Sequence, residues 1–419
     1  MAEASPIQGR IHAAVSDQFP LIAALLFENR RETFVGASLI AVMLYALLII
    51  FGAINVNQLE TFGGTVFGGD FVVFWTAANS VFAENLATIY GTDNFEARLA
   101  DNFPGRHTFN VSWQYPPTMF LLVAPFAALP YLPALFAWWA ANLVLFTAAI
   151  RTLWRDGSAL LIALASAAVF QGLITGQTGL LTASLLALAA YKPAQKPLIA
   201  GLAAGVLTVK PQFGLLIPIA FAAAGCWRAF GVAAIAGASL AVFSILAFGV
   251  DIWPAWYEAV LTHGGRLQSE IFPYYKVISP YGGLMVIGAP SAVAMTLQAA
   301  FAFSLCALVF LVWRKIGDWD LRLMALCAAA PLATPYAFYY ELPIFVLPLL
   351  LVAKRATETG WLPGERAGLI ALWAAPLFIT NFGHAWYVPY TAVLTGAAFF
   401  TTARRPFLAL QDKRTDGAP

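Results

Sequence analysis

The chain has 419 residues, of which 61% are hydrophobic and only 11% are charged, and its formal net charge at pH 7 is +2. Soluble domains carry about 25% charged residues. With a mean hydropathy of +0.76, this composition excludes an ordinary soluble protein and indicates a polytopic membrane protein. The small net charge gives no reason to expect a nucleic-acid partner.

The N-terminal residues 1–33 are predicted to form a cytoplasmic or interfacial segment. No short apolar core precedes a small-residue cleavage site, so we do not expect a cleaved signal peptide. Residues 7–28 have the composition of an amphipathic helix on the membrane surface. Farther along, the three cysteines lie in or beside apolar runs without metal-ligand spacing, and we expect them to be small buried hydrophobic side chains.

The first membrane-length apolar run covers residues 34–54, enough to cross a hydrocarbon core of roughly 30 Å. Basic residues precede this run and few follow it, so the positive-inside rule places the N-terminus in the cytoplasm. Residues 55–116 are therefore predicted to form a large first outer loop, which contains the longest polar stretch in the chain.

This first outer loop is expected to carry interfacial amphipathic helices. One would run from Asp70 to Glu84, with an apolar stripe that could rest on the bilayer. The stripe consists of Phe71, Phe74, Trp75, Ala78 and Phe82. A second short helix is predicted from Thr92 to Asp101.

The rest of the chain is predicted to cross the membrane repeatedly, so the expected fold is all-α with about twelve transmembrane helices and both termini in the cytoplasm. Residues 117–150, interrupted by Pro130 and Pro133, fit either two full spans or one span with a surface or re-entrant portion. The further spans are expected near 158–174, 179–191, 197–209, 213–225, 229–250, 284–313, 321–334, 336–353, 367–380 and 388–403. Residues 251–283 form a second, aromatic outer segment. A single transmembrane domain thus covers 34–403, followed by a cytoplasmic tail at 404–419.

On this topology the unusual polar residues fall at the outer ends of apolar spans. They are Asp70, Tyr115, Gln177, Lys210, Gln212, Glu341 and His384. Charged groups at membrane depth are costly and usually serve a site or a pathway. Several of them on one face, in separate turns, therefore indicate a single site.

Each of these residues also has a plainer explanation, which the sequence leaves open. Asp70 suits the N-cap of the helix that follows it, and Lys210 suits a lysine that snorkels to the interface. Glu341 fits an interfacial acid or a partner for a basic residue, and His384 fits an interfacial histidine. Gln177 could satisfy backbone groups in its glycine-flanked turn.

Metal and nucleotide chemistry have little support in the sequence. There is no HExxH motif and no Cys/His cluster, and the four histidines are scattered, so no divalent metal or other cofactor is expected. There is no P-loop and no GxGxxG beside a strand. A Ser/His/Asp triad stays open, although no GxSxG supports one.

Short motifs along residues 34–350, in this order and spacing, resemble the polytopic polyprenyl-phosphate-dependent glycosyltransferases of the GT-C type. More narrowly, the chain resembles glycosyltransferase family 87, the group that contains the mycobacterial phosphatidylinositol-mannoside mannosyltransferases. The motifs are Gly69-Asp70-Phe71, Ile89-Tyr90, Tyr115-Pro116-Pro117, Leu129-Pro130, Trp138 to Asn142, Gly176-Gln177 and the run from Gly201 to Lys210-Pro211-Gln212.

The resemblance implies an inverting transfer of a hexose, most simply mannose, from a polyprenyl-phosphate sugar to a lipid or glycan acceptor. It implies a multi-pass protein of the bacterial cytoplasmic membrane, surrounded by membrane lipids, with its active site facing the periplasm. Asp70 would be the general base. Lys210, Gln212 and Gln177 would bind the donor phosphate, and Tyr115, Tyr340, Glu341 and His384 would bind substrate.

One feature departs from the family. Related enzymes often carry a histidine in the outer turn of a late span, but the turn Tyr336 to Glu341 has none. Tyr340, Glu341 or His384 could take its place, which leaves the acceptor and the sugar open. Two other functions remain: a transporter or lipid flippase, and a non-catalytic membrane protein of envelope assembly. Against a transporter, the sequence shows no inverted repeat, and its polar groups gather at one surface.

Overall fold

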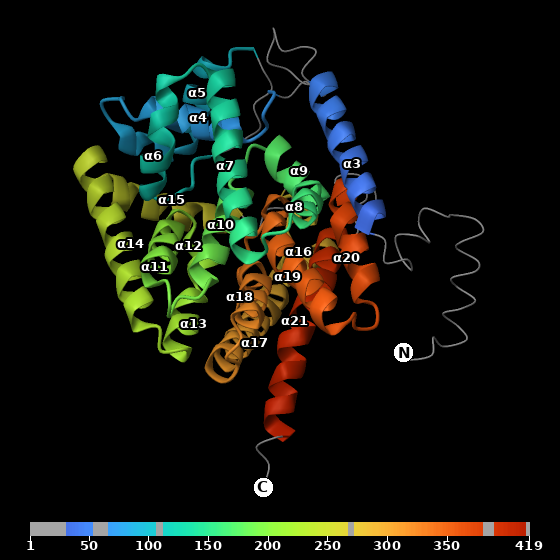
Figure 1. Ribbon diagram of the computed structural model, residues 1–419. Helices are drawn as coiled ribbons and strands as arrows, with labels where there is room; N and C mark the ends of the chain where they lie inside the picture. Colours follow the sequence, from blue (N-terminus) through green and yellow to red (C-terminus); the bar gives the residue numbers. More distant parts are fainter. Residues whose placement is uncertain (1–30, 53–65, 106–111, 267–271, 380–388, 416–419) are drawn as a thin grey trace.

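The computed structural model describes residues 31–52, 66–105, 112–266, 272–379 and 389–415, which form an assembly of packed helices (Figure 1). Within these ranges the chain contains no extended strand; one isolated antiparallel bridge pairs Val277 with Phe338. The predicted all-α class is therefore confirmed. The surface helix predicted at 7–28 lies outside the described residues.

The described helices follow one another from the first apolar run to the tail. The first part contains α3 (Arg31–Gly52), α4 (Phe71–Ser80), α5 (Thr92–Asn102), α6 (Thr118–Val123), α7 (Tyr131–Leu153), α8 (Gly157–Leu164), α9 (Ala167–Ile174), α10 (Gly179–Ala190), α11 (Pro197–Val206), α12 (Pro211–Gly214) and α13 (Ile217–Ala223). The second part contains α14 (Trp227–Phe248), α15 (Ile252–Arg266), α16 (Pro280–Val286), α17 (Ser291–Lys315), α18 (Trp319–Ala333), α19 (Pro343–Thr359), α20 (Glu365–Ala374) and α21 (Tyr390–Thr415). Short 3-10 helices are η2 (Leu86–Tyr90), η3 (Ala124–Ala128), η4 (Leu207–Val209), η5 (Tyr274–Lys276), η6 (Tyr339–Glu341) and η7 (Ala375–Phe378).

Four of the described helices are long and apolar enough to cross a membrane. They are α3, α7, α14 and α17, and the pair α8 and α9, bent by 54°, would make a fifth span. The protein is thus an all-helical membrane protein, while the number of about twelve crossings stays a prediction. Several expected spans are divided into shorter helices, because a proline lacks the backbone donor that a helix interior needs. The run 284–313, for example, divides around Pro290 into α16 and α17.

The structure distinguishes between the two arrangements left open for residues 117–150. This stretch forms the short α6 and η3 and then one long helix, α7, of 23 residues. Pro130 is the N-cap of α7 and Pro133 lies in its first turn, where the backbone amides have no partner in the helix to lose. One span preceded by a shorter segment is therefore the arrangement found.

Helices α10, α18 and α19 form the centre of the assembly. Most residues of α10 are buried on all sides, as expected for a helix whose sequence is apolar all round. It packs against α7, α11, α18 and α19. The turn that precedes α10, which contains Gln177, is therefore held at a fixed place inside the protein.

The described parts of the predicted outer loop, residues 66–105 and 112–116, pack against the helices that follow them. The helices predicted at Asp70–Glu84 and Thr92–Asp101 exist as α4 and α5. The prediction that the stripe of α4 rests on lipid is wrong, because Phe71 and Phe74 are buried against Trp138 of α7. Their ring centroids lie 6.0 Å and 5.4 Å, respectively, from that of Trp138. Of the stripe, Phe82 lies 83% exposed, just beyond the end of α4.

Two glycine-rich turns from distant parts of the chain touch backbone to backbone. Gly69 precedes α4 and Gly176 lies between α9 and α10, and both have positive φ, +55° and +62°. A Cβ at Gly176 would lie 2.2 Å from the carbonyl oxygen of Gly68, and one at Gly69 would lie 2.9 Å from that of Thr175. The amide of Asp70 donates to the Thr175 oxygen at 2.8 Å. Only glycine allows this approach.

Replacing Gly176 by alanine is expected to destabilise the protein far more than the same change at Gly225. Both glycines have a left-handed φ, +62° and +67°, but a Cβ at Gly225 meets nothing within 4 Å. Gly225→Ala should cost about 1 kcal/mol of unfolding free energy from backbone strain. Gly176→Ala should cost roughly 1–3 kcal/mol more, because the obstacle is backbone. Thermal and denaturant unfolding of the purified protein in detergent measures both, and equal losses would contradict the close contact.

Candidate functional site

The Asp70 carboxylate faces the turn between α9 and α10. Asp70 occupies the N-cap position of α4, as one explanation predicted, but its side chain makes no capping hydrogen bond to that helix. Instead, Gln177 Nε2 donates to Asp70 Oδ2 at 2.9 Å. Gln177 is only 8% exposed, and its Oε1 accepts from the hydroxyl of Tyr115 at 2.9 Å. Asp70 itself is half-buried, and its Oδ1 has no hydrogen bond to any described residue.

Lys210 forms a buried ion pair with Glu341. It lies in the bend between η4 and α12, and its ammonium donates to Glu341 Oε1. The two residues are 5% and 1% exposed, so Lys210 does not snorkel to an interface. Of the two plainer explanations of Glu341, the partner for a basic residue is the one found. The other carboxylate oxygen, Oε2 of Glu341, is buried without a hydrogen-bond partner among the described residues. A buried acceptor without a donor is costly. This oxygen is therefore available to accept a hydrogen bond from a bound group.

Aromatic rings surround the Lys210 ammonium. The ring centroids of Tyr115, Phe213 and Tyr340 lie 5.6, 5.7 and 5.1 Å from Nζ. Rings at this distance attract a cation through their quadrupole. They also keep water from the ammonium, so its charge acts on neighbouring groups with little screening.

Tyr115 connects the two halves of the cluster. Its hydroxyl donates to Gln177, its ring lies beside Lys210 Nζ, and its backbone oxygen accepts from the hydroxyl of Tyr90 at 2.9 Å. The cluster of Asp70, Tyr115, Gln177, Lys210 and Glu341, here called the polar cluster, therefore joins five segments of the chain. Four of the sequence-predicted residues beyond Asp70 are thus brought together with it.

The start of α10 fixes the distance between the two halves. A Cβ at Gly179 would lie 1.8 Å from the backbone oxygen of Tyr340, so α10 begins in direct contact with η6. Trp138 Nε1 of α7 donates to the Gly176 oxygen at 3.1 Å and holds the same turn from the other side. The side chains of Gln177 and Glu341 are placed by these backbone contacts.

The electrostatics of the site centre on Asp70. Burial raises the pKa of the Asp70 carboxyl, and this increase is only partly offset by the Gln177 hydrogen bond and the positive charges of Lys276 and Lys210. The carboxyl is thus poised to accept a proton more readily than an exposed aspartate.

Lys276 is a site residue that the sequence did not single out. This half-buried lysine lies in η5, and its positive charge lowers the pKa of Asp70 although the two are more than two hundred residues apart. It is the one lysine of the predicted outer segment 251–283, a signal that could have singled it out. It was also missed that Thr178, next to Gln177, has a buried hydroxyl oxygen with no described hydrogen-bond partner.

Two predicted residues are not joined to the polar cluster. Gln212 is half-buried in α12 and its side chain makes no hydrogen bond within the described ranges. His384 lies outside the described residues. Among the residues that the structure describes, no three His, Cys, Asp or Glu side chains gather as a metal site would require. The expectation that no metal is needed stays a prediction.

Removing one partner of the buried Lys210–Glu341 pair is expected to be costly. Lys210→Met or Glu341→Leu alone should lower the unfolding free energy by about 3–5 kcal/mol, because the remaining charge is left unpaired. The double variant should lose much less than the sum. As a control, the partly exposed pair Lys354–Asp320, 2.8 Å apart, should lose about 1 kcal/mol or less when Lys354 becomes methionine. Additive losses at Lys210 and Glu341 would show that the pair does not act as a unit.

Comparison with known proteins gives one family. A family model described as glycosyltransferase family 87 matches residues 113–335, more than half of the chain. The matched range contains Tyr115, Gln177 and Lys210, whereas Asp70 precedes it and Glu341 follows it. Neither the curated proteins nor the solved structures gave a match.

Proposed function

The chain belongs to glycosyltransferase family 87, and from this premise we propose that it transfers a hexose, with mannose as the expected sugar, from a polyprenyl-phosphate sugar to a lipid or glycan acceptor. In this proposal the reaction takes place at the outer face of the bacterial cytoplasmic membrane, and both termini lie in the cytoplasm. The observation that carries the proposal is the polar cluster, in which one carboxylate and one ammonium group are joined through Gln177 and Tyr115.

Asp70 is the general base of the proposed reaction. Gln177 holds Oδ2, which leaves Oδ1 free of any described hydrogen bond and able to accept the proton of an acceptor hydroxyl. A general base works best when its pKa approaches the operating pH. The raised pKa of Asp70 moves it in that direction.

The bond changes then follow from one displacement. The acceptor oxygen forms a bond to the anomeric carbon while its proton passes to Asp70. The bond between that carbon and the phosphate oxygen breaks, and the lipid phosphate leaves with the electron pair. Because attack and departure occur on opposite sides, the anomeric configuration inverts.

In the proposed reaction, the ammonium of Lys210 stabilises the negative charge that develops on the leaving phosphate. An ammonium serves as a point charge for phosphate oxygens, and stabilisation of charge that develops in the transition state is a large catalytic contribution. Glu341 holds this ammonium in the structure. The donor phosphate therefore binds beside Glu341 or replaces it, with Tyr115 and Tyr340 next to the incoming group. Gln212 and His384 stay proposed contacts to phosphate and substrate.

Purified protein should be incubated with radiolabelled polyprenyl-phosphate sugars and total membrane lipid. A labelled product formed from the mannose donor supports the proposal and shows whether the acceptor is a lipid. Activity unchanged by a chelator would support a transfer without a divalent metal. A product formed only from a nucleotide sugar would overturn the proposed donor.

Asp70→Asn should lower kcat by about 10²–10⁴-fold, because an amide does not accept the acceptor's proton. Donor binding should be retained, since Lys210 is unchanged. The control Asp101→Asn removes an exposed carboxylate of α5 in the same outer loop and should leave kcat unchanged. Single-turnover kinetics with labelled donor, together with a donor-binding assay, measures both. A non-catalytic or transport protein would keep its role in the Asp70→Asn variant.

The acid limb of the profile of kcat/KM against pH should lie at a higher pH than the ordinary pKa of an aspartate would give. The base must be ionised, so kcat/KM should fall as the pH drops through the raised pKa of Asp70. The Gln177→Leu variant removes the hydrogen bond that lowers this pKa, so the limb should move to still higher pH. A limb that stays in place when Gln177 is changed would show that another group is the base.

A further inference from the structure

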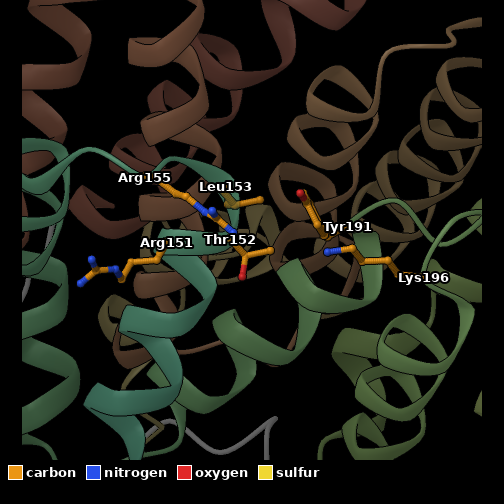
Figure 2. A pocket seen from close by; sticks show the side chains of 6 residues that line it. All are labelled: Arg151, Thr152, Leu153, Arg155, Tyr191 and Lys196. Atoms are coloured by element: carbon orange, nitrogen blue, oxygen red, sulfur yellow. The ribbon is translucent and has the colours of Figure 1, made fainter.

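A second polar site lies at the other ends of α7 and α10. A cavity of about 590 Å³ opens there, lined by Arg151, Thr152, Leu153, Arg155, Tyr191 and Lys196. Figure 2 shows Arg155 and Lys196 extending toward the gap from opposite sides, while Arg151 points away from it. The two cations that face each other come from different connections, one after α7 and one after α10.

The cations of this cavity have no carboxylate partner among the described residues, since none of Arg151, Arg155 and Lys196 forms an ion pair there. The acid next to Arg155 in the chain, Asp156, accepts hydrogen bonds from Ser158 and Ala159 as the N-cap of α8. Like charges that face one cavity repel each other unless an anion lies between them.

Some basic residues elsewhere have an acidic partner and others do not. Lys354, Arg355 and Arg405 each have a carboxylate within 2.8 Å, whereas the exposed Arg314 and Lys315 form no ion pair within the described ranges. Arg155 and Lys196 are exposed as well, and what distinguishes them is that they extend toward one gap from opposite sides. A general excess of basic residues on the cytoplasmic side does not account for two cations pointing at each other across a hollow.

The segment that carries Lys196 is held in a defined conformation. The Lys192 carbonyl accepts from the amides of Gln195 and Lys196, both at 2.9 Å, and Lys192 itself has a φ of +47°. A non-glycine residue in this conformation is strained by about 1–3 kcal/mol. Lys196 Nζ lies 5.0 Å from the ring centroid of Tyr191, so the ammonium is placed before any ligand arrives.

The cavity lies at the end of a membrane-length helix, and this position indicates which anion it would meet. α7 is long and apolar enough to span the membrane, and the cavity lies at its last turn, the end far from the contact between Tyr131 and Phe67 near the polar cluster. Lipid phosphates lie at the level where a span ends. A guanidinium recognises a phosphate through paired hydrogen bonds and an ammonium does so as a point charge.

We propose that this cavity binds the phosphate of an anionic membrane phospholipid, with Arg155 and Lys196 as its two cationic contacts. Basic pockets between transmembrane helices on the cytoplasmic side suit such headgroups. A zwitterionic headgroup is disfavoured, because its own ammonium would meet the same two cations. The site is separate from the polar cluster, and the proposal does not depend on the reaction proposed there.

The test measures lipid retention by the purified full-length protein. Wild-type protein is reconstituted in phosphatidylcholine nanodiscs with or without phosphatidylglycerol, then released and weighed by native mass spectrometry. Wild-type protein should retain phosphatidylglycerol in preference to phosphatidylcholine. The Arg155→Gln, Lys196→Gln variant should bind it roughly 30-fold more weakly, as expected for the loss of two basic contacts.

The matched control is Arg314→Gln, Lys315→Gln, which removes two exposed basic residues at the end of α17. It should retain phosphatidylglycerol as the wild-type protein does. An equal loss of phosphatidylglycerol retention in both double variants would show that only surface charge matters and would overturn the proposal. A wild-type protein without a preference for phosphatidylglycerol would overturn it too. Inorganic phosphate alone provides a further arm: tight binding of free phosphate without lipid retention would overturn the lipid assignment. Unchanged thermal unfolding of the variants excludes misfolding. If the double variant does not fold, the single variant Arg155→Gln should still show a smaller loss of phosphatidylglycerol retention.

Discussion

The contact between the turns at Gly69 and Gly176 is the constraint on which the rest of the site depends. These turns come from segments more than a hundred residues apart, and they approach so closely that neither tolerates a Cβ without displacing backbone. The same α7 binds both turns, through Tyr131 to the Phe67 oxygen at 2.6 Å and through Trp138 to the Gly176 oxygen at 3.1 Å. Asp70 and Gln177 meet because one rigid helix holds the two turns together.

A second constraint is electrostatic. The Lys210–Glu341 pair is buried among aromatic rings, where two charges are stable only as partners. Polar groups in such a place are seldom retained for stability alone, because well-packed apolar residues would serve as well or better. A phosphate-binding role under the proposed reaction gives this costly arrangement a purpose.

Much of the site was predictable from the sequence. Asp70, Tyr115, Gln177, Lys210 and Glu341 stand out because charged and amide groups beside apolar runs are costly, and the helices α4 and α5 follow from their periodicity and turn residues. All five meet in the structure. Glu341 lies in the turn where related enzymes often carry a histidine, and its substitution for that histidine stays a prediction.

What failed to follow from the sequence depended on tertiary partners. An apolar stripe such as Phe71 and Phe74 packs equally well on lipid or on Trp138, and periodicity does not distinguish them. The charge of Lys276 lowers the pKa of Asp70 only because the fold brings two distant segments of the chain near each other. Asp70 does lie at the N-cap of α4, but its carboxylate accepts from Gln177 and makes no capping hydrogen bond, a choice that depends on the packing of a distant turn. The basic cavity brings together residues from two connections, and only the packing of α7 beside α10 places them at one hollow.

The shortness of α10 has a consequence for how substrates arrive. Its 12 residues rise about 18 Å, against a hydrocarbon layer of roughly 30 Å. Under the proposed topology, with its basic end at the inner boundary, a helix of this length would leave the Gln177 turn beneath the outer boundary. In the proposed reaction, a sugar carried on a prenyl chain would then enter sideways while its tail stays among the acyl chains, and a hydroxyl of another lipid would reach it there. A free glycan would have to descend from the periplasm, so this depth would favour a lipid acceptor.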